Sequence, residues 1–449
     1  MQLGFSAILR PSVLAMISRW LRMVMFLISI VAIGTVVVDY GFVLDETEKT
    51  VIRHIYDDTW WVYFASYLFR LIFDWSSINR KTIFMTAFLG LLLALSAWSR
   101  FALPPVDGRF LIWLWDLSAN KLLTIIVVVL FAALDISRGV VSFIDKKTNP
   151  ALLMAVCFAV IILFGTLLLL LPRFTLEHIR LSVIDALFVS TSAVCVTGLS
   201  TVDISQTFSI EGQMVIALLV QIGGLGVMTI TSFFAMFFMG GMGLYNQFAL
   251  RDMVGADTFS SLISTLLYIL GFTFTIEMLG ACFIWFSIHG TIGMTMHEEL
   301  FFSAFHSISA FCNAGFSTLP GNLGNPTLLY GHNFFYLVIS VLVILGGIGF
   351  PILMNFRRLV SYYLLKSLQR RESDLERLRY IHLTNINTKI VLVTTSILLG
   401  GGFLLIALLE WNGAFVGKSV GEKLVQSFFT SVIPRTAGFN SIDLTHFSL

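Results

Sequence analysis

Three short segments of this chain combine a glycine with neighbours that suit cation coordination. In each segment a phenylalanine stands ten residues before the glycine, a hydroxyl residue stands eight before it, and Leu or Phe follows it directly. The glycines are Gly198, Gly315 and Gly438. A cation without its water shell needs a ring of oxygens, which backbone carbonyls supply where extended loops close around an axis. The segments therefore favour a cation filter built from backbone.

We predict that four residues around each glycine present their carbonyl oxygens to the ion. Glycine allows backbone angles that turn carbonyls toward the axis, where a side chain would clash. The predicted ion-binding residues are Val196, Thr197, Gly198 and Leu199 in the first loop, Asn313, Ala314, Gly315 and Phe316 in the second, and Thr436, Ala437, Gly438 and Phe439 in the third.

Two neighbours of each glycine are expected to support the loop. The bulky residue after the glycine should wedge the loop from behind, and the hydroxyl before it should bond back to the backbone of the helix that precedes the loop. The wedges are Leu199, Phe316 and Phe439, and the hydroxyls are those of Ser190, Ser307 and Thr430. The competing interpretation is that each glycine merely ends a buried helix, but three in register favour the filter.

The elements that must hold these loops are membrane spans. The 449 residues are 57% hydrophobic and 12% charged, whereas a soluble chain is usually about one quarter charged. Apolar runs of about 20 residues predict helices that cross the bilayer. They lie at 22–43, 58–75, 82–99, 120–143, 151–172, 209–240, 260–288, 333–356 and 390–410. The second run is the weakest, because it is short and carries Arg70.

Three further apolar stretches, at 183–196, 300–312 and 424–434, are too short to span and are typical of re-entrant pore helices. Each repeat then consists of span, pore helix, filter loop and span. We predict an all-α polytopic membrane protein with three such repeats begun and about two and a half complete. The predicted domains are extra N-terminal spans at 1–148, repeat one at 149–258, repeat two with a basic connector at 259–388, and an incomplete repeat three at 389–449.

The distribution of Lys and Arg predicts the orientation. Alternating spans bring the N-terminal arginines and the basic stretch 357–389 to one side, which we assign to the cytoplasm. The opposite side receives Asp45, Glu46, Glu48, Asp57 and Asp58. The short stretches then all enter from outside, and the N-terminus is cytoplasmic in a plasma membrane, expected to be a bacterial inner membrane.

A few other residues carry open alternatives. Glu277, in the middle of a span, is either a functional carboxylate or a hydrogen-bonded packing group, and packing is favoured. His306 is expected to make a polar contact inside the fold. The glycines at 223, 224 and 226 and at 346, 347 and 349 are either hinges or small-residue packing sites, and packing is favoured, with Pro351 adding a kink.

The four cysteines, Cys157, Cys195, Cys282 and Cys312, lack metal-site spacing. Catalytic triads, paired carboxylates and phosphate loops are not recognisable, so we predict that the chain is not an enzyme. No cofactor and no nucleic-acid partner are expected, and the lipid bilayer is the expected surrounding.

Five motifs resemble the Trk/Ktr/HKT superfamily of cation transporters over roughly residues 150–449. They are Cys195–Leu199, Gln221–Gly226, Ser309–Phe316, Gly346–Pro351 and Arg435–Asn440. The resemblance implies four repeats around one pore, with a filter glycine in each. Glycine rather than serine at Gly198 favours potassium over sodium. It also implies a homodimer and a cytoplasmic nucleotide-binding regulatory subunit, which the charged stretch 366–389 could dock if it is not simply a solvated face.

Two departures from the superfamily pattern are visible. The chain stops inside repeat three, so the gating loop of that repeat and a basic residue of repeat four have no counterpart, and we expect the 449 residues to be a fragment. The four predicted spans of the first 145 residues are more than the superfamily usually adds.

Two other transport functions stay open. One is the channel-like subunit of an ATP-driven potassium pump, which shares this repeat plan. The other is an ion-coupled sodium/potassium symporter, which would have broken helices in inverted repeats. Here the three repeats run in the same sense, which favours a pore.

Overall fold

The computed structural model contains helices as its regular elements, which confirms the all-α prediction. The structure describes residues 11–73, 80–101, 115–116, 121–143, 150–177, 179–238, 259–329, 331–349, 352, 386–434 and 437–442. Within this part of the chain, extended pairing is limited to one bridge between Thr175 and Phe208. The chain divides into two compact units, Met1–Thr148 and Asn149–Leu449.

The first unit packs four long helices. They are α1 (Pro11–Gly41), α2 (Glu46–Phe73), α3 (Arg80–Phe101) and α5 (Lys121–Phe143). Helix α5 contacts each of the other three. Trp60 and Tyr63 of α2 are fully buried between them, and Tyr63 shares a hydrogen bond of 2.9 Å with Ser29 of α1.

Helix α2 begins well before the predicted span at 58–75. Asp45 is the reason, because its side chain accepts a hydrogen bond from the backbone N–H of Glu46 while Glu48 accepts one from that of Asp45. Such reciprocal bonds start a helix. The acidic residues from Glu46 to Asp58, which we had expected in an outer loop, therefore form the first turns of α2.

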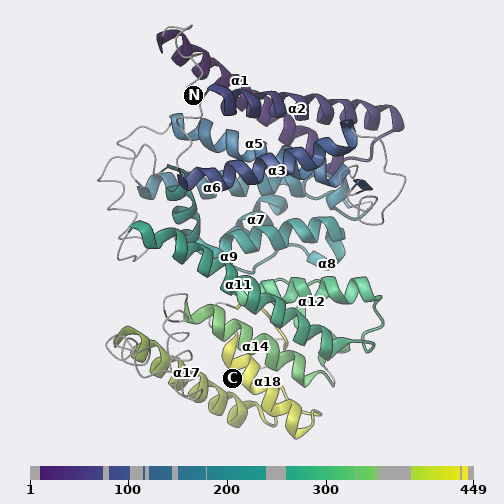
Figure 1. The fold of residues 1–449 in the computed structure, drawn as a ribbon. Helices are drawn as coiled ribbons and strands as arrows, with labels where there is room; N and C mark the ends of the chain where they lie inside the picture. Colours follow the sequence, from purple (N-terminus) through teal and green to yellow (C-terminus); the bar gives the residue numbers. More distant parts are fainter. Residues whose placement is uncertain are drawn as a thin grey trace. The chain divides into compact units, whose positions relative to one another are not determined.

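The second unit contains three consecutive groups of helices, which follow one another in chain order in Figure 1. The first group is α6 (Pro150–Leu169), α7 (Val183–Val194), α8 (Ile204–Thr207) and α9 (Ile210–Phe238); the second is α11 (Phe259–Ile288), α12 (Met296–Phe311), α13 (Pro326–Leu329) and α14 (Asn333–Ile348); the third is α17 (Ile386–Glu410) and α18 (Val420–Val432). Helix α9 contacts α11 and α12, and α14 contacts α18, so neighbouring groups are joined through their inner helices.

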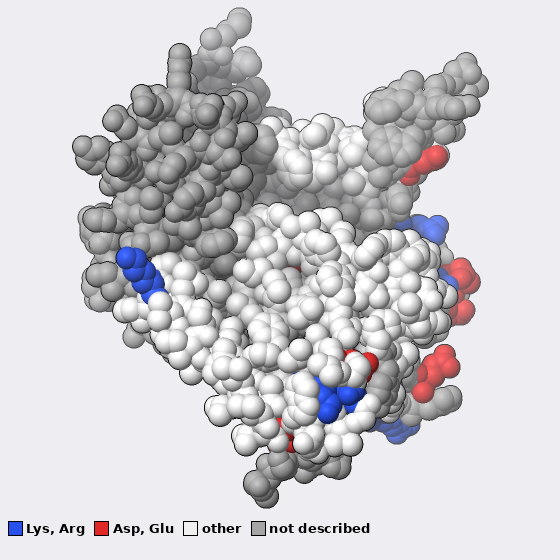
Figure 2. Space-filling view, turned by 90° about the horizontal axis from the view of Figure 1, so that it is seen from below, with Lys and Arg blue, Asp and Glu red and all other residues white. Residues whose placement is uncertain are grey.

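Three helices among the described residues are long and apolar enough to cross a membrane. They are Met23–Gly41, Leu267–Ile288 and Thr388–Glu410. Each agrees with a predicted span, although the third begins two residues before the predicted start at 390. Helix α2 does not qualify. Shorter apolar helices occupy Ala87–Trp98, Ala155–Leu169, Val183–Val194, Ile210–Gly226 and Asn333–Ile348. Figure 2 shows a broad face of the described surface that is free of Lys, Arg, Asp and Glu except for small groups of charges. These features fit a multi-pass membrane protein. The basic residues between 357 and 385 lie outside the described part.

Two apolar clusters form the interior of the second unit. One joins α7 and α9 and includes Phe305 of α12. The other joins α11, α12 and α14 and includes Phe429 of α18. The second and third groups thus each insert a phenylalanine of their short helix into the cluster of the preceding group.

Candidate functional site: three converging glycine loops

The three short helices α7, α12 and α18 begin in the same way. Their first residues are preceded by Ser182, Thr295 and Ser419, whose side chains each accept a hydrogen bond from the backbone N–H of an acidic residue three positions later. In α12 and α18 the glutamate also accepts from the capping residue's own N–H, over 2.8 Å in both. A hydroxyl residue followed after three positions by Glu or Asp is a readable helix start, although we did not predict these helices from it.

These carboxylates lie outside the spans. Hydrogen bonds to the backbone N–H of Thr295 and of Ser419 lower the pKa of Glu298 and of Glu422, and the Ser182 hydroxyl does the same for the pKa of Asp185. Each short helix therefore begins on a negative charge, which suits the positive end of its dipole. Its opposite, partly negative end is then the one that leads into the glycine loop.

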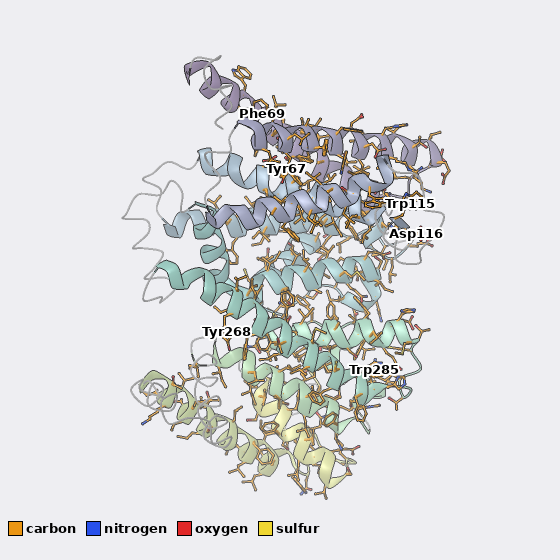
Figure 3. The ribbon with its side chains drawn as sticks, viewed as in Figure 1. Tyr67, Phe69, Trp115, Asp116, Tyr268 and Trp285 are labelled. Carbon is orange, nitrogen blue, oxygen red and sulfur yellow. The ribbon has the colours of Figure 1, made fainter. Side chains whose placement is uncertain are left out.

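A second anchor holds the start of α12. Glu299 is almost fully buried and accepts hydrogen bonds from the backbone N–H of Gly290, over 2.9 Å, and at 2.8 Å from Nδ1 of His289. The ring of Trp285, labelled in Figure 3 near the end of α11, lies 4.6 Å from that of His289. The His289 bond is the main reason why the pKa of Glu299 is lowered. No sequence pattern pointed to this contact.

The loops after α7 and α12 have the same backbone form. Gly198 and Gly315 have φ of 79° and 70°, and the residues two positions earlier, Val196 and Asn313, have φ of 54° and 59°. Gly438 in the third loop has φ of 70°. Left-handed backbone is unusual for a β-branched residue such as valine and is often found at functional sites. The sequence identified the glycines, but the left-handed Val196 and Asn313 were not foreseen.

The three glycines meet at one point. A Cβ added to Gly438 would lie 3.0 Å from the carbonyl oxygen of Ala314, 3.1 Å from Cα of Gly315 and 3.2 Å from Cα of Gly198. A Cβ on Gly198 would lie within 3.0 Å of the Ala314 oxygen, and one on Gly315 within 3.0 Å of the backbone of Gly438. Since the obstructing atoms are backbone, the convergence leaves no room for side chains.

The predicted filter residues thus lie on loops that come together. All of those in the first two loops are described, as are Ala437, Gly438 and Phe439 in the third, whereas Thr436 lies outside the described residues. Two carbonyls already have protein partners, because Asn322 Nδ2 donates to Gly315 over 3.2 Å and Ser309 Oγ donates to Phe316 over 2.8 Å. The role of these residues in ion binding stays a prediction.

The wedge prediction is correct for two of the three loops. Phe316 and Phe439 are each only 2% exposed. Leu199 is 60% exposed, so the prediction that it wedges the first loop is wrong. The reason is that Phe316 and Phe439 pack into the two apolar clusters, neither of which extends over Leu199.

The hydroxyl prediction is also wrong, because Ser190 and Ser307 bond to the long helix before the short one, and in the third group Ser431 does so in place of Thr430. Ser190 Oγ donates to the carbonyl of Ile162 over 2.8 Å, Ser307 Oγ to that of Glu277 over 2.7 Å, and Ser431 Oγ to that of Leu399 over 2.9 Å. Three positions after each carbonyl stands a glycine, at 165, 280 and 402, where an added Cβ would lie within 3.0 Å of the serine oxygen. We call each such serine and glycine pair a serine lock.

In the third group the lock uses Ser431, which stands seven residues before the loop glycine Gly438. Thr430, at the spacing of eight, has a buried hydroxyl without a hydrogen-bond partner among the described residues. The segment between the lock serine and the loop glycine is therefore one residue shorter in the third group than in the other two. Alignment on the loop glycines alone hid this difference. Counted from the lock serine, the counterpart of Phe305 is Phe429 rather than Phe428.

The lock predicts different effects for these two neighbouring hydroxyls. We expect Ser431→Ala to lower the stability of the protein by about 1 kcal/mol, because a hydrogen bond between membrane helices is lost. Thr430→Ala, the matched control, should change it much less. Thermal unfolding of the two purified variants in detergent would measure both, and equal melting temperatures would contradict the lock.

The glycine pairs of α9 and α14 pack against the ends of the short helices α7 and α12. A Cβ on Gly223 would lie within 3.0 Å of the carbonyl oxygen of Val194, and one on Gly346 within 3.0 Å of that of Phe311. Val194 and Phe311 are the last residues of α7 and α12. The packing interpretation is thus correct for these glycines, although the partner is a pore-helix carbonyl.

The third glycine of each motif has another role. Gly226, with φ of 75° and ψ of 172°, interrupts α9, and Gly349, with φ of 89°, follows the last residue of α14. Gly226 has no atom within 4 Å of an added Cβ. The backbone leaves helical geometry at both positions, and for Gly226 the packing interpretation is wrong.

Polar contacts behind the second loop agree with the expectation for His306. Its Nδ1 donates to the carbonyl of Phe302 over 2.8 Å, and its Nε2 lies 2.9 Å from Oγ of Ser317. Among the described residues no group of three or more His, Cys, Asp or Glu side chains could hold a metal ion.

Short helices that end on converging glycine loops, packed against long apolar helices, are typical of membrane transport proteins. Comparison with known proteins specifies the family. The model of the TrkH family, described as a cation transport protein, matches residues 124–448. The chain belongs to this family.

Two of the curated relatives are bacterial uptake proteins. Potassium/sodium uptake protein NtpJ of Enterococcus hirae is 35% identical over 307 residues, which are 68% of this chain and 62% of the relative. Ktr system potassium uptake protein B of Bacillus subtilis is 35% identical over 303 residues, 66% of this chain and 61% of the relative. The chain thus spans about three fifths of the length of these relatives. The crystal structure of the potassium transporter TrkH from Vibrio parahaemolyticus is 14% identical, with a TM-score of 0.45 over 92% of this chain and 63% of that chain.

Proposed function

We propose that this protein takes up potassium across the membrane through a pore whose filter is formed by backbone carbonyls of the glycine loops. The observation that carries the proposal is the convergence of Gly198, Gly315 and Gly438, all with left-handed backbone. Family membership supports it, as do relatives named as potassium uptake proteins. The proposed filter residues are the four around each glycine, at 196–199, 313–316 and 436–439.

A filter ring has to close around the ion. The exposure of α7 supports a further loop beside the three. Phe305 and Phe429 are 2% and 1% exposed because each packs into the preceding group, whereas their counterpart Phe188 is 40% exposed. We propose that a further unit covers α7 at Phe188 and completes the ring.

The cellular setting follows from the same resemblance. We propose a bacterial plasma membrane with the N-terminus in the cytoplasm, a homodimer, and a cytoplasmic nucleotide-binding regulatory subunit. The words "Ktr system" in the names of two Bacillus subtilis relatives support further subunits. The name of the Enterococcus hirae relative supports sodium as a second ion, either as a competing or as a coupled ion.

Ion flux into liposomes tests this proposal against its alternatives. We expect the purified full-length protein to pass potassium down its gradient without ATP and without a sodium gradient, because a carbonyl-lined pore needs neither. Flux that requires ATP would favour the pump subunit, and flux that requires a sodium gradient would favour the symporter. An absence of potassium flux under all three conditions would contradict the proposed function.

A further inference from the structure

Glu277 is a buried acidic residue that the proposed pore does not need for ion coordination. It lies in the middle of α11 and is 5% exposed. Its backbone carbonyl accepts the hydrogen bond that Ser307 Oγ donates in the serine lock of the second group. Its side-chain Oε1 accepts a hydrogen bond of 3.0 Å from Nε2 of Gln221 and lies 3.8 Å from the thiol of Cys312. One residue thus contacts the first group of helices, the second pore helix and the end of that helix.

The contact with Cys312 brings the carboxyl group to the base of the second glycine loop. Cys312 caps the C-terminus of α12 and stands three residues before Gly315. Its side chain fills the space above Gly224, where an added Cβ would lie within 3.0 Å of Sγ. Gln221 lies three residues before Gly224 on α9, which places both on one side of that helix. Gln221, Gly224 and Glu277 therefore enclose Cys312 from two groups of helices.

The serine lock does not explain why an acidic residue stands here. The corresponding lock carbonyls belong to Ile162 in the first group and Leu399 in the third. Apolar side chains suffice at those positions, since the lock uses only the backbone. The carboxyl group of Glu277 is thus specific to the second group, where its contact joins two groups beside a filter loop.

The surroundings of Glu277 favour an uncharged role. Within the described part of the chain, the hydrogen-bond partners of its carboxyl group are an amide and a thiol. A buried carboxylate that is not paired with a cation is strongly disfavoured. A neutral carboxyl group still offers an acceptor oxygen to Gln221 and Cys312. Glutamine at this position would offer the same oxygen.

We propose that Glu277 is a positioning residue for the second filter loop, and that it acts through an uncharged acceptor oxygen that holds Cys312 against α9. The proposal rests on the proposed function for its link to selectivity. The contacts of Glu277 with Gln221 and Cys312 do not depend on which ion is transported. The packing of Cys312 and the ion preference can therefore be measured separately.

The first measurement follows the loop itself. In a full-length protein whose other cysteines, at 157, 195 and 282, are replaced by serine, a small maleimide reports the accessibility of Cys312, which is 8% exposed. We expect Glu277→Leu and Gln221→Leu to raise the labelling rate several-fold, and Glu277→Gln to leave it unchanged. Unchanged labelling in both leucine variants would overturn the proposal, whatever ion is transported.

The second measurement is potassium uptake with sodium competition at matched protein levels. We expect Glu277→Leu and Gln221→Leu to weaken the preference for potassium several-fold, with the double variant no worse than the poorer single one, and Glu277→Gln to keep the preference. A loss in Glu277→Gln as large as in Glu277→Leu would show that charge matters and overturn the uncharged role. If Glu277→Leu fails to fold, the other two variants still test the proposal, which requires Gln221→Leu to weaken the preference for potassium and Glu277→Gln to keep it. A wild-type protein that moves no potassium would refute the proposed function but leave the labelling result standing.

Discussion

Gly315→Ala is expected to reduce potassium uptake by about tenfold or more, a change of at least 1.4 kcal/mol in the barrier. Two effects combine, because φ at Gly315 is 70° and an added Cβ would lie within 3.0 Å of the backbone of Gly438. Backbone cannot move aside as a flexible side chain can, so the alanine has to displace a neighbouring loop.

Gly321→Ala is the matched control for this variant. Gly321 also has positive φ, at 76°, but has nothing within 4 Å of an added Cβ. It therefore carries the conformational cost, about 1 kcal/mol, without the obstruction. Uptake of potassium at equal protein levels should separate the two variants, and equal losses in both would show that backbone strain alone accounts for the effect.

Gly346→Ala is expected to prevent most of the protein from folding. An added Cβ would lie within 3.0 Å of the carbonyl oxygen of Phe311, the last residue of α12. The neighbouring Gly347 provides the control, since its nearest contact is the side-chain amide of Asn313 at 3.4 Å, an ordinary van der Waals distance. The amount of monodisperse protein recovered in detergent should fall sharply for Gly346→Ala and change little for Gly347→Ala. Similar recovery of both variants would contradict the close approach of α14 to α12.

Much of this site was readable because glycine leaves a strong signal. A glycine after a short apolar run limits both the helix end and the backbone that follows, so the positions of Gly198, Gly315 and Gly438 and the short helices before them were predictable. Apolar runs likewise indicated the long helices. These signals are local, and each can be read within about 20 residues.

The missed features depend on contacts between distant residues. The serine locks join positions 28, 30 and 32 residues apart, so the glycine spacing could not reveal that Ser431 replaces Thr430. The exposure of Leu199 depends on which cluster lies over its loop. The early start of α2 was readable from Asp45 and Glu48, but the charges there suggested a loop.

The central claim is that the converging glycine loops select the ion. Its most direct measurement is potassium uptake, with sodium as competitor, in cells that lack other potassium importers and produce either the wild-type protein or the Gly198→Ser variant at equal levels. We expect potassium-selective uptake by the wild type and weaker discrimination by Gly198→Ser, because a Cβ at this position meets the Ala314 carbonyl and disturbs the spacing of the ring. Wild-type uptake and selectivity in normally produced Gly198→Ser and Gly315→Ala variants would contradict the assignment of these loops to the filter.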